Sequence, residues 1–110
     1  MKVLHLTLKK KFFDMILSGE KKEEYREIES GYWCKRFCQK GWESFEIEIL
    51  HNAINKQYDI VHFYNGGSAW LKYPNFQIEC KGITIGKAKS EWSDNWQGEV
   101  FIIKLGNIIK

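Results

Sequence analysis

The chain has 110 residues, of which 44% are hydrophobic, 15% aromatic and 28% charged, and its formal net charge is +3. This composition excludes a disordered chain and a membrane protein, and the length predicts a single domain over residues 1–110. The modest positive charge permits a nucleic-acid partner without requiring one.

The N-terminal segment has neither a long apolar run nor a small-residue cleavage site, and no apolar run approaches the roughly 20 residues that span a bilayer. We therefore expect a cytoplasmic protein with no membrane partner. The three cysteines and three histidines are scattered without CxxC, HxH or HxxxH spacing, so we expect reduced structural thiols, no metal site and no cofactor.

The first two elements follow from hydrophobic periodicity. Residues 2–8 alternate, with Leu4, Leu6 and Leu8 on one face, which predicts a half-buried strand. From Lys10 to Ser18 the apolar residues recur at spacings of three and four, which predicts a helix, and Gly19 stands where a left-handed cap belongs. The following "KKEEYREI", residues 21–28, alternates like a strand but has no apolar face, so burial alone does not explain it.

The middle of the chain gives weaker patterns. "YWCKRFCQK", residues 32–40, favours a short helix. "SFEIEIL", residues 44–50, fits both a strand and a helical spacing that continues to Ile54, and we favour the helix. "YDIVHFYNGG", residues 58–67, predicts a strand closed by a turn, because Asn-Gly-Gly adopts positive φ at little cost.

The last third of the chain predicts two strands. In "NFQIECKGITIG", residues 75–86, the apolar residues change from even to odd positions at Lys81 and Gly82, which indicates a β-bulge. "EVFIIKLG", residues 99–106, is the last expected strand, and a polar loop with Trp92 and Trp96 joins the two. Together these elements predict a mainly β, α+β fold: a small mixed β-barrel of about five to six strands with two to three flanking helices. An open α+β sheet is the alternative.

Residues 19–26 contain the pattern G-x-K-x-x-E-x-R, formed by Gly19, Lys21, Glu24 and Arg26. With the apolar helix before it, the "FYNGG" turn, the "ECKGITIG" strand and the closing "FIIKLG", the chain resembles small single-domain bacterial and phage members of the ASCH domain family, which belongs to the PUA-like superfold. The resemblance covers most of the chain except roughly residues 42–57. It implies a PUA-like barrel with a cleft lined by the motif, and RNA or a modified nucleoside as the partner.

The resemblance also implies a rival enzymatic function. A few small members of the family are amidohydrolases that remove the acyl group from cytidine acylated on its exocyclic amine, and ribonuclease activity is reported for another. The amidohydrolases use the motif lysine, a threonine where this chain has Glu24, and a glutamate from a later loop. By this likeness Lys21, Glu24 and Glu91 are the candidate catalytic residues, with Glu79 as the other candidate for the later carboxylate.

The motif residues have two interpretations. The charge pattern alone favours an exposed ion pair between Glu24 and Arg26, worth less than about 1 kcal/mol. The resemblance favours a cleft, in which Arg26 binds a phosphate or carboxylate with two hydrogen bonds and a desolvated Lys21 acts as general base or nucleophile. In that cleft Glu24 orients Lys21 or takes part in proton transfer.

Aromatic side chains are the other candidates for ligand binding, because stacking contributes about 1 to 3 kcal/mol per base. Tyr64, Trp70 and Trp92 lie in or beside polar, glycine-bearing loops, and Asn65 in the same turn has an amide that can read the edge of a base. Their alternative roles are core packing for the rings and turn formation for the asparagine. A protein-interaction domain that uses exposed Trp residues is a third, less favoured function.

Overall fold

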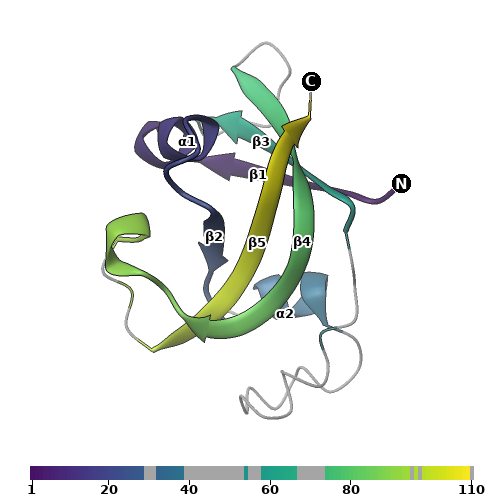
Figure 1. Cartoon of the computed structure of the whole chain (residues 1–110). Coiled ribbons are helices and arrows are strands. Elements are labelled where there is room, and N and C mark those ends of the chain that lie inside the picture. Colours follow the sequence, from purple (N-terminus) through teal and green to yellow (C-terminus); the bar gives the residue numbers. More distant parts are fainter. Residues whose placement is uncertain are drawn as a thin grey trace. The chain divides into compact units, whose positions relative to one another are not determined.

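The computed structural model of the chain describes residues 1–28, 32–38, 54, 58–66, 74–94, 96 and 98–109. Figure 1 shows the strands and helices that these residues form. In chain order they are β1 (Val3–Leu8), α1 (Lys10–Leu17), β2 (Glu23–Arg26), α2 (Tyr32–Phe37), β3 (Ile60–Asn65), β4 (Asn75–Lys87), the 3-10 helix η2 (Ser90–Trp92) and β5 (Glu99–Ile109).

The described strands form one five-stranded sheet in the order β1-β3-β4-β5-β2. β1 runs parallel to β3, with Val3 opposite Ile60, and β3 runs antiparallel to β4, with Ile60 opposite Glu79. The predicted fold class is confirmed, since a mixed sheet with two α-helices fits a small mixed β fold with flanking helices. In this part of the chain, no helix has the length and apolar character needed to cross a membrane.

The chain folds into two compact units, each assembled from segments that are separate in the sequence. Unit 1 comprises Met1–Glu23, Tyr58–Lys81 and Lys104–Lys110, and unit 2 comprises Glu24–Gln57 and Gly82–Ile103. The two long strands β4 and β5 each contribute residues to both units, so each unit has its own part of the sheet.

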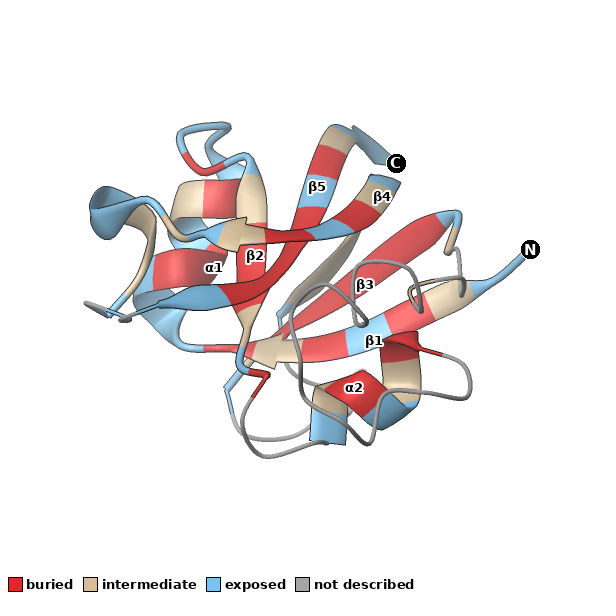
Figure 2. Cartoon of the chain, turned by 90° about the horizontal axis from the view of Figure 1, so that it is seen from below, coloured by how far each residue is buried: buried red, intermediate tan, exposed pale blue. Residues whose placement is uncertain are grey.

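Unit 1 is built on β1 and β3. Figure 2 shows that buried residues alternate with less buried ones along β1 and follow one another along β3. Leu4, Leu6 and Leu8 are buried while His5 is exposed, so the predicted half-buried strand is confirmed. β3 lies between β1 and β4 in the sheet, and its residues from Ile60 to Tyr64 are all buried.

Helix α1 packs through the apolar face that its sequence predicts. Phe12, Phe13 and Ile16 are buried, and the Phe13 ring meets the Phe76 ring of β4 edge-on at a centroid distance of 5.0 Å. Burial of one such side chain contributes about 1.5 to 3 kcal/mol, so three of them account for the docking of this eight-residue helix, which is too short to be stable alone.

Strand β4 changes its buried face at the predicted position. Ile78 is buried before the change, and Ile83 and Ile85 are buried after it. Between them Gly82 has φ +131°, a conformation that side-chain-bearing residues rarely adopt. The phase change in the sequence therefore marks a real backbone irregularity within one continuous strand.

Unit 2 has a core of aromatic and β-branched side chains. Tyr25 of β2 packs with Val100 and Ile102 of β5, and Trp92 packs against this cluster. Elsewhere in the unit the Phe37 ring of α2 meets the Phe101 ring edge-on at 5.2 Å. Helix α2 confirms the predicted helix for residues 32–37. The helix expected over residues 44–50 lies outside the described residues.

Candidate ligand-binding site

The end of α1 sets the position of Lys21. After the cap residue Ser18, Gly19 has φ +88°, which turns the chain away from the helix axis as the sequence predicts. The Lys21 N–H then donates to the Met15 carbonyl at 3.0 Å, which satisfies a carbonyl of the last turn. One residue later the Lys22 carbonyl accepts from the Leu105 N–H of β5 at 3.1 Å. The G-x-K part of the motif is thereby attached to both α1 and β5 within unit 1.

The Lys21 side chain is buried. Lys21 is only 2% exposed, whereas its neighbours Glu20 and Lys22 are exposed. Its ammonium nitrogen lies 4.3 Å from the centroid of the Phe12 ring, a cation–π distance that contributes on the order of 1 to 2 kcal/mol in a desolvated place. This lysine therefore does not belong to a solvated charge cluster. Burial of an ammonium group costs several kcal/mol.

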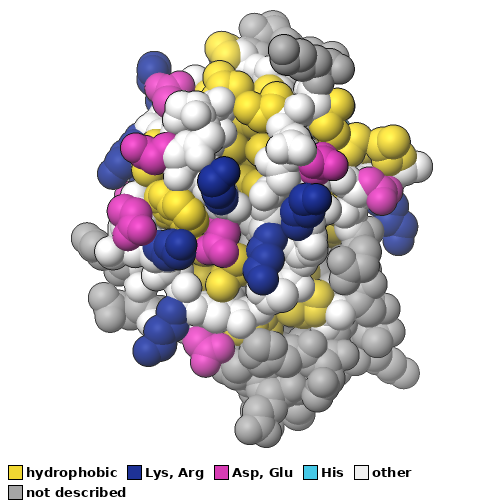
Figure 3. Space-filling model, viewed as in Figure 1, with side chains coloured by type: hydrophobic (Ala, Val, Ile, Leu, Met, Phe, Trp, Pro, Cys, Tyr) yellow, Lys and Arg dark blue, Asp and Glu magenta, His cyan; other side chains and the backbone are white. Residues whose placement is uncertain are grey.

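A cavity of about 240 Å³ lies beside this lysine in unit 1. Its walls come from the end of α1, the motif, β4 and the C-terminal part of β5, and they combine the apolar residues Ile16, Ile78 and Leu105 with polar ones such as Ser18 and Asn107. Leu17 and Ile108 also line it and are 45% and 38% exposed. Figure 3 shows hydrophobic side chains gathered on this face over the start of β4 and the end of β5. Lys21 and Lys22 are also among the residues that line it.

Glu24 and Arg26, the other charged residues of the motif, form an ion pair in unit 2. Arg26 Nη2 lies 2.8 Å from Glu24 Oε2, and their side chains are 17% and 7% exposed. The Arg26 guanidinium group lies 5.0 Å from the centroid of the Trp33 ring of α2. The pair is therefore largely removed from water. The charge pattern alone predicts an exposed pair instead, so the two differ in their energetics.

The candidate later carboxylates have different surroundings. Glu79 Oε1, in β4, accepts a hydrogen bond from the Asn107 N–H of β5 at 2.8 Å, so this carboxylate holds the end of β5 within unit 1. Glu91 lies in η2 of unit 2 and is exposed. Glu79 is half-buried, so Glu91 is the more exposed of the two.

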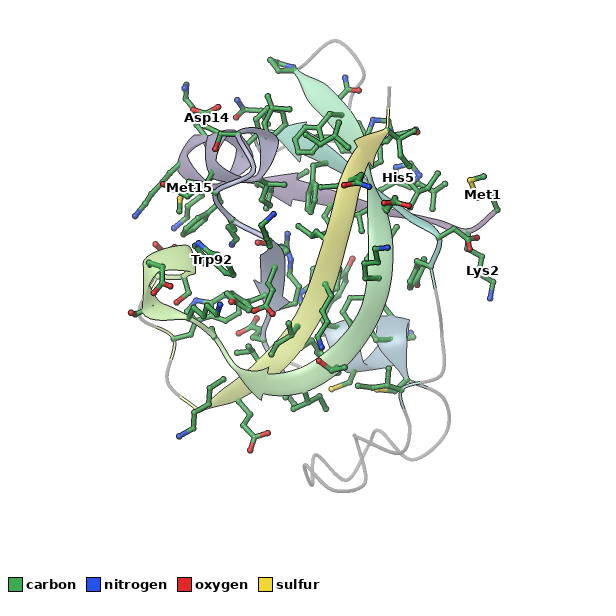
Figure 4. All side chains as sticks on the ribbon, viewed as in Figure 1. Met1, Lys2, His5, Asp14, Met15 and Trp92 are labelled. Atoms are coloured by element: carbon green, nitrogen blue, oxygen red, sulfur yellow. The ribbon has the colours of Figure 1, made fainter. Side chains whose placement is uncertain are left out.

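Tyr64 is the next-to-last residue of β3, beside the loop that follows, and its ring belongs to a hydrogen-bonded network of unit 1. Its ring stacks on His62 at 4.4 Å and its hydroxyl is 2.9 Å from His5 Nδ1. Tyr64 is buried, so it stabilises the sheet face formed by β1 and β3. Asn65 is half-buried at the end of β3, where its N–H donates to the Pro74 carbonyl at 2.9 Å. Figure 4 labels His5 on β1.

Trp92 lies on η2, where Figure 4 labels it, and is half-buried. It packs on the cluster of Tyr25, Val100 and Ile102, and the Lys89 ammonium lies 4.5 Å from its ring centroid. The Tyr25 hydroxyl accepts from the Lys89 N–H at 3.2 Å, which fixes the start of this loop. Trp70 lies outside the described residues.

The sequence did not indicate which aromatic rings lie against the motif residues Lys21 and Arg26. Phe12 reads as a core residue of α1, and only the structure shows that Lys21 lies against its ring. Trp33 is one of several available aromatics, and no sequence spacing links it to Arg26, seven residues earlier. The only local signal for these two contacts is that each aromatic residue belongs to a helix close in sequence to the motif.

Comparisons with protein-family models, with curated proteins and with solved structures find no match to this chain. The resemblance to ASCH domains thus stays a prediction from the motif and its setting, and the candidate site depends on its own geometry.

Proposed function

We propose that the protein binds a nucleobase, either of a modified nucleoside or of an unpaired RNA nucleotide, in the cavity lined by Lys21. The observation that carries this proposal is the burial of the motif lysine at the wall of a cavity that is partly apolar. The resemblance to ASCH domains points to the same class of ligand. Burial of an ammonium group lowers the stability of the fold by several kcal/mol, so a role in ligand binding accounts for it better than a purely structural role.

The chemistry of the cavity matches a base. A nucleobase has apolar faces, which suit walls made of Ile16, Ile78 and Leu105, and it has carbonyl or ring-nitrogen acceptors on its edge. The Lys21 ammonium group carries N–H donors, the kind of group that such acceptors bind. A volume of about 240 Å³ lies below the roughly 300 to 1,000 Å³ of typical ligand pockets, which favours a single base over a larger ligand.

Hydrolysis of an acylated base is the second candidate function. It is favoured by the same observation, since an amidohydrolase needs a desolvated amine or carboxylate beside its substrate. In the reaction, water adds across the amide bond, the acyl group leaves as a carboxylic acid and the exocyclic amine of cytidine regains its proton. Glu24 stands at the position of the family's threonine, so the assay must decide whether turnover occurs.

The test uses cytidine acylated on its exocyclic amine, with cytidine as the comparison ligand. Equilibrium binding is measured by calorimetry, and deacylation is followed by its ultraviolet change. We expect wild-type protein to bind the nucleoside and Lys21→Met to bind at least tenfold more weakly, because the loss of one charged hydrogen bond costs about 1.5 to 3 kcal/mol. Turnover that disappears in Lys21→Met would add the hydrolase function.

Two further variants test the cavity independently, in case the Lys21→Met protein does not fold. Leu17→Glu and Ile108→Glu place a carboxylate at exposed positions that line the cavity, so we expect both to fold and to lose binding. Lys104→Glu changes charge at an exposed position of β5 that does not line the cavity, and we expect it to bind normally. Binding that survives in Leu17→Glu and Ile108→Glu would exclude this cavity as the nucleobase site.

A further inference from the structure

The buried Lys21 lies against the ring of Phe12, a residue of helix α1. The ammonium nitrogen of Lys21 is 4.3 Å from the ring centroid, and the two residues are 2% and 8% exposed. A cation within about 6 Å of a ring centroid is attracted to the negative face of the ring, more strongly where water is excluded. Lys21 has other interactions as well, so the ring acts together with them.

The backbone after α1 brings the two side chains together. The Gly19 N–H donates to the Ile16 carbonyl at 3.1 Å, and the Lys21 N–H donates to the Met15 carbonyl at 3.0 Å. Met15, which Figure 4 labels, comes three residues after Phe12, so the two are neighbours on one face of the helix. With its backbone fixed at Met15, the long Lys21 side chain has to run back only about one helical turn to reach the Phe12 ring.

Phe12 lies behind Lys21 as seen from the cavity. Lys21 lines the cavity and Phe12 does not, so an effect of Phe12 on a ligand would have to pass through the lysine. Lys11 Nζ is also near the ring, at 5.4 Å, but Lys11 is exposed and water weakens that contact. Of these two lysines, Lys21 is therefore the one on which the ring has the larger effect.

Phe13, the next residue of α1, has a different kind of partner. Its ring is also buried, but it meets the ring of Phe76 edge-on at 5.0 Å. An aliphatic side chain in place of Phe12 would fill space beside Lys21 without the charge distribution of an aromatic ring. The two neighbouring phenylalanines thus separate the effect of packing from the effect of a ring that faces a cation.

We propose that Phe12 is a positioning residue of the candidate site: its ring holds the charged end of Lys21 at the cavity wall and thereby sets the affinity for the ligand. This inference rests on the proposed function, since it concerns the ligand of the same cavity. The role of Phe12 comes from the electrons of its ring and not only from the volume that the ring fills.

The experiment replaces Phe12 by mono-, tri- and pentafluorophenylalanine. Fluorine withdraws electron density from the face of the ring and changes its size little, so the series weakens the cation–π attraction stepwise while the ring still packs. Two quantities are measured for each protein. The first is the NMR signal of the Lys21 ε-methylene group, assigned through bonds from the backbone amide, and the second is the affinity for the acylated cytidine, measured by calorimetry.

We expect both quantities to follow the degree of fluorination. The Lys21 signal moves stepwise toward that of an exposed lysine such as Lys104, because the ammonium group leaves the ring. The pentafluoro protein binds the nucleoside about 5- to 30-fold more weakly than wild type, which corresponds to about 1 to 2 kcal/mol for a cation–π contact away from water. Circular dichroism checks that each protein is folded.

Phe13 supplies the matched control, because its ring belongs to the same helix and is buried to a similar degree. The same fluorinated residues in place of Phe13 leave the Lys21 signal and the affinity unchanged. Among ordinary variants, Phe12→Leu weakens nucleoside binding and Phe13→Leu does not, although both lose an aromatic ring from the core.

The inference and the proposed function fail separately. A Lys21 signal that stays constant across the Phe12 series would overturn the inference, and so would a signal that moves while the affinity stays constant. Nucleoside binding that is lost in Leu17→Glu but is indifferent to fluorination of Phe12 would overturn the role of Phe12 alone. No nucleoside binding by wild-type protein would overturn the proposed function, and with it the effect of Phe12 on affinity, even where the Lys21 signal follows the series.

Discussion

Arg26 Nη2 lies 2.8 Å from Glu24 Oε2, in an ion pair whose side chains are 17% and 7% exposed. The exposed pair between Lys10 and Asp14 of α1, at 2.6 Å, has side chains that are 76% and 52% exposed. The two pairs have similar N–O distances and differ strongly in their access to water. Comparing them separates the effect of burial from that of charge.

Replacement of Arg26 is expected to be strongly destabilising. Arg26→Met removes the guanidinium partner of a buried carboxylate, which costs about 3 kcal/mol, at the low end for buried pairs because Arg26 keeps some solvent contact. Urea unfolding, followed by circular dichroism, measures the change in the free energy of unfolding.

The control for Arg26 is Lys10→Met, which breaks the exposed pair with Asp14 and is expected to cost less than about 1 kcal/mol. If both substitutions had the same small effect, the motif pair would be energetically equivalent to a surface pair, contrary to its burial.

Gly19 is expected to resist substitution because of its backbone conformation. A Cβ at this position meets nothing within 4 Å, so any cost of Gly19→Ala comes from its φ of +88°. We expect a loss of about 1 kcal/mol for Gly19→Ala and a smaller loss for Gly19→Asn, since asparagine tolerates positive φ better. Thermal unfolding of the three proteins tests this order. A fully stable Gly19→Ala would show that the chain turns here without the left-handed conformation.

Cys34 gives a pH dependence of stability with a definite sign. Burial raises the pKa of its thiol above the ordinary value of 9.0, and a backbone hydrogen bond acts in the opposite direction. The folded chain therefore holds this proton more tightly than the unfolded chain. The contribution to stability is complete below pH 9.0 and decreases as the pH rises through the folded-state pKa. We expect wild-type protein to lose more stability than Cys34→Ala between about pH 8 and pH 10.

Urea unfolding at the two pH values measures this difference, and the subtraction of the variant removes the effects of other groups that titrate in the range. Equal losses in both proteins would mean that Cys34 ionises as easily in the folded chain as in the unfolded one.

His62 is expected to carry its ring hydrogen on one particular nitrogen, Nε2. Its Nε2 lies 2.9 Å from the Asn75 Oδ1, which can only accept, so Nε2 carries the hydrogen. Its Nδ1 lies 3.4 Å from the Gln77 amide nitrogen, which donates, so Nδ1 carries none. Nitrogen-15 chemical shifts of the imidazole at neutral pH report this directly. A mixture of the two tautomers, like that of an exposed histidine, would show that this network does not hold His62.

Local sequence patterns were sufficient for much of the fold. The alternation of Leu4, Leu6 and Leu8, the spacing of apolar residues in α1 and the cap at Gly19 are properties of short segments, and each is confirmed. The change of phase in β4 also appears within one strand, at Gly82. In these cases the structure depends on residues that are neighbours in the sequence, so a pattern of a few residues is enough to predict it.

The candidate site depends on contacts that no local pattern contains. Lys21 and Glu24 look like members of an exposed charge cluster, but both are buried, Lys21 against the Phe12 ring and Glu24 in its ion pair with Arg26. The sequence predicts Tyr64 in or beside a loop, and the structure places it next to the end of β3, where its pairing with Thr7 and its contact with His5 add what the sequence could not show. Such contacts join residues far apart in sequence, and only the folded chain shows them.

The most direct test of the nucleobase proposal is a titration of nitrogen-15-labelled protein with the acylated cytidine, followed by two-dimensional NMR. We predict saturable shifts of the backbone signals of Lys21, Lys22, Leu105 and Ile108, which line the cavity, and no shift of these signals in Leu17→Glu. Saturation of the protein without movement of these four signals, or no binding at millimolar ligand, would contradict a nucleobase site in this cavity.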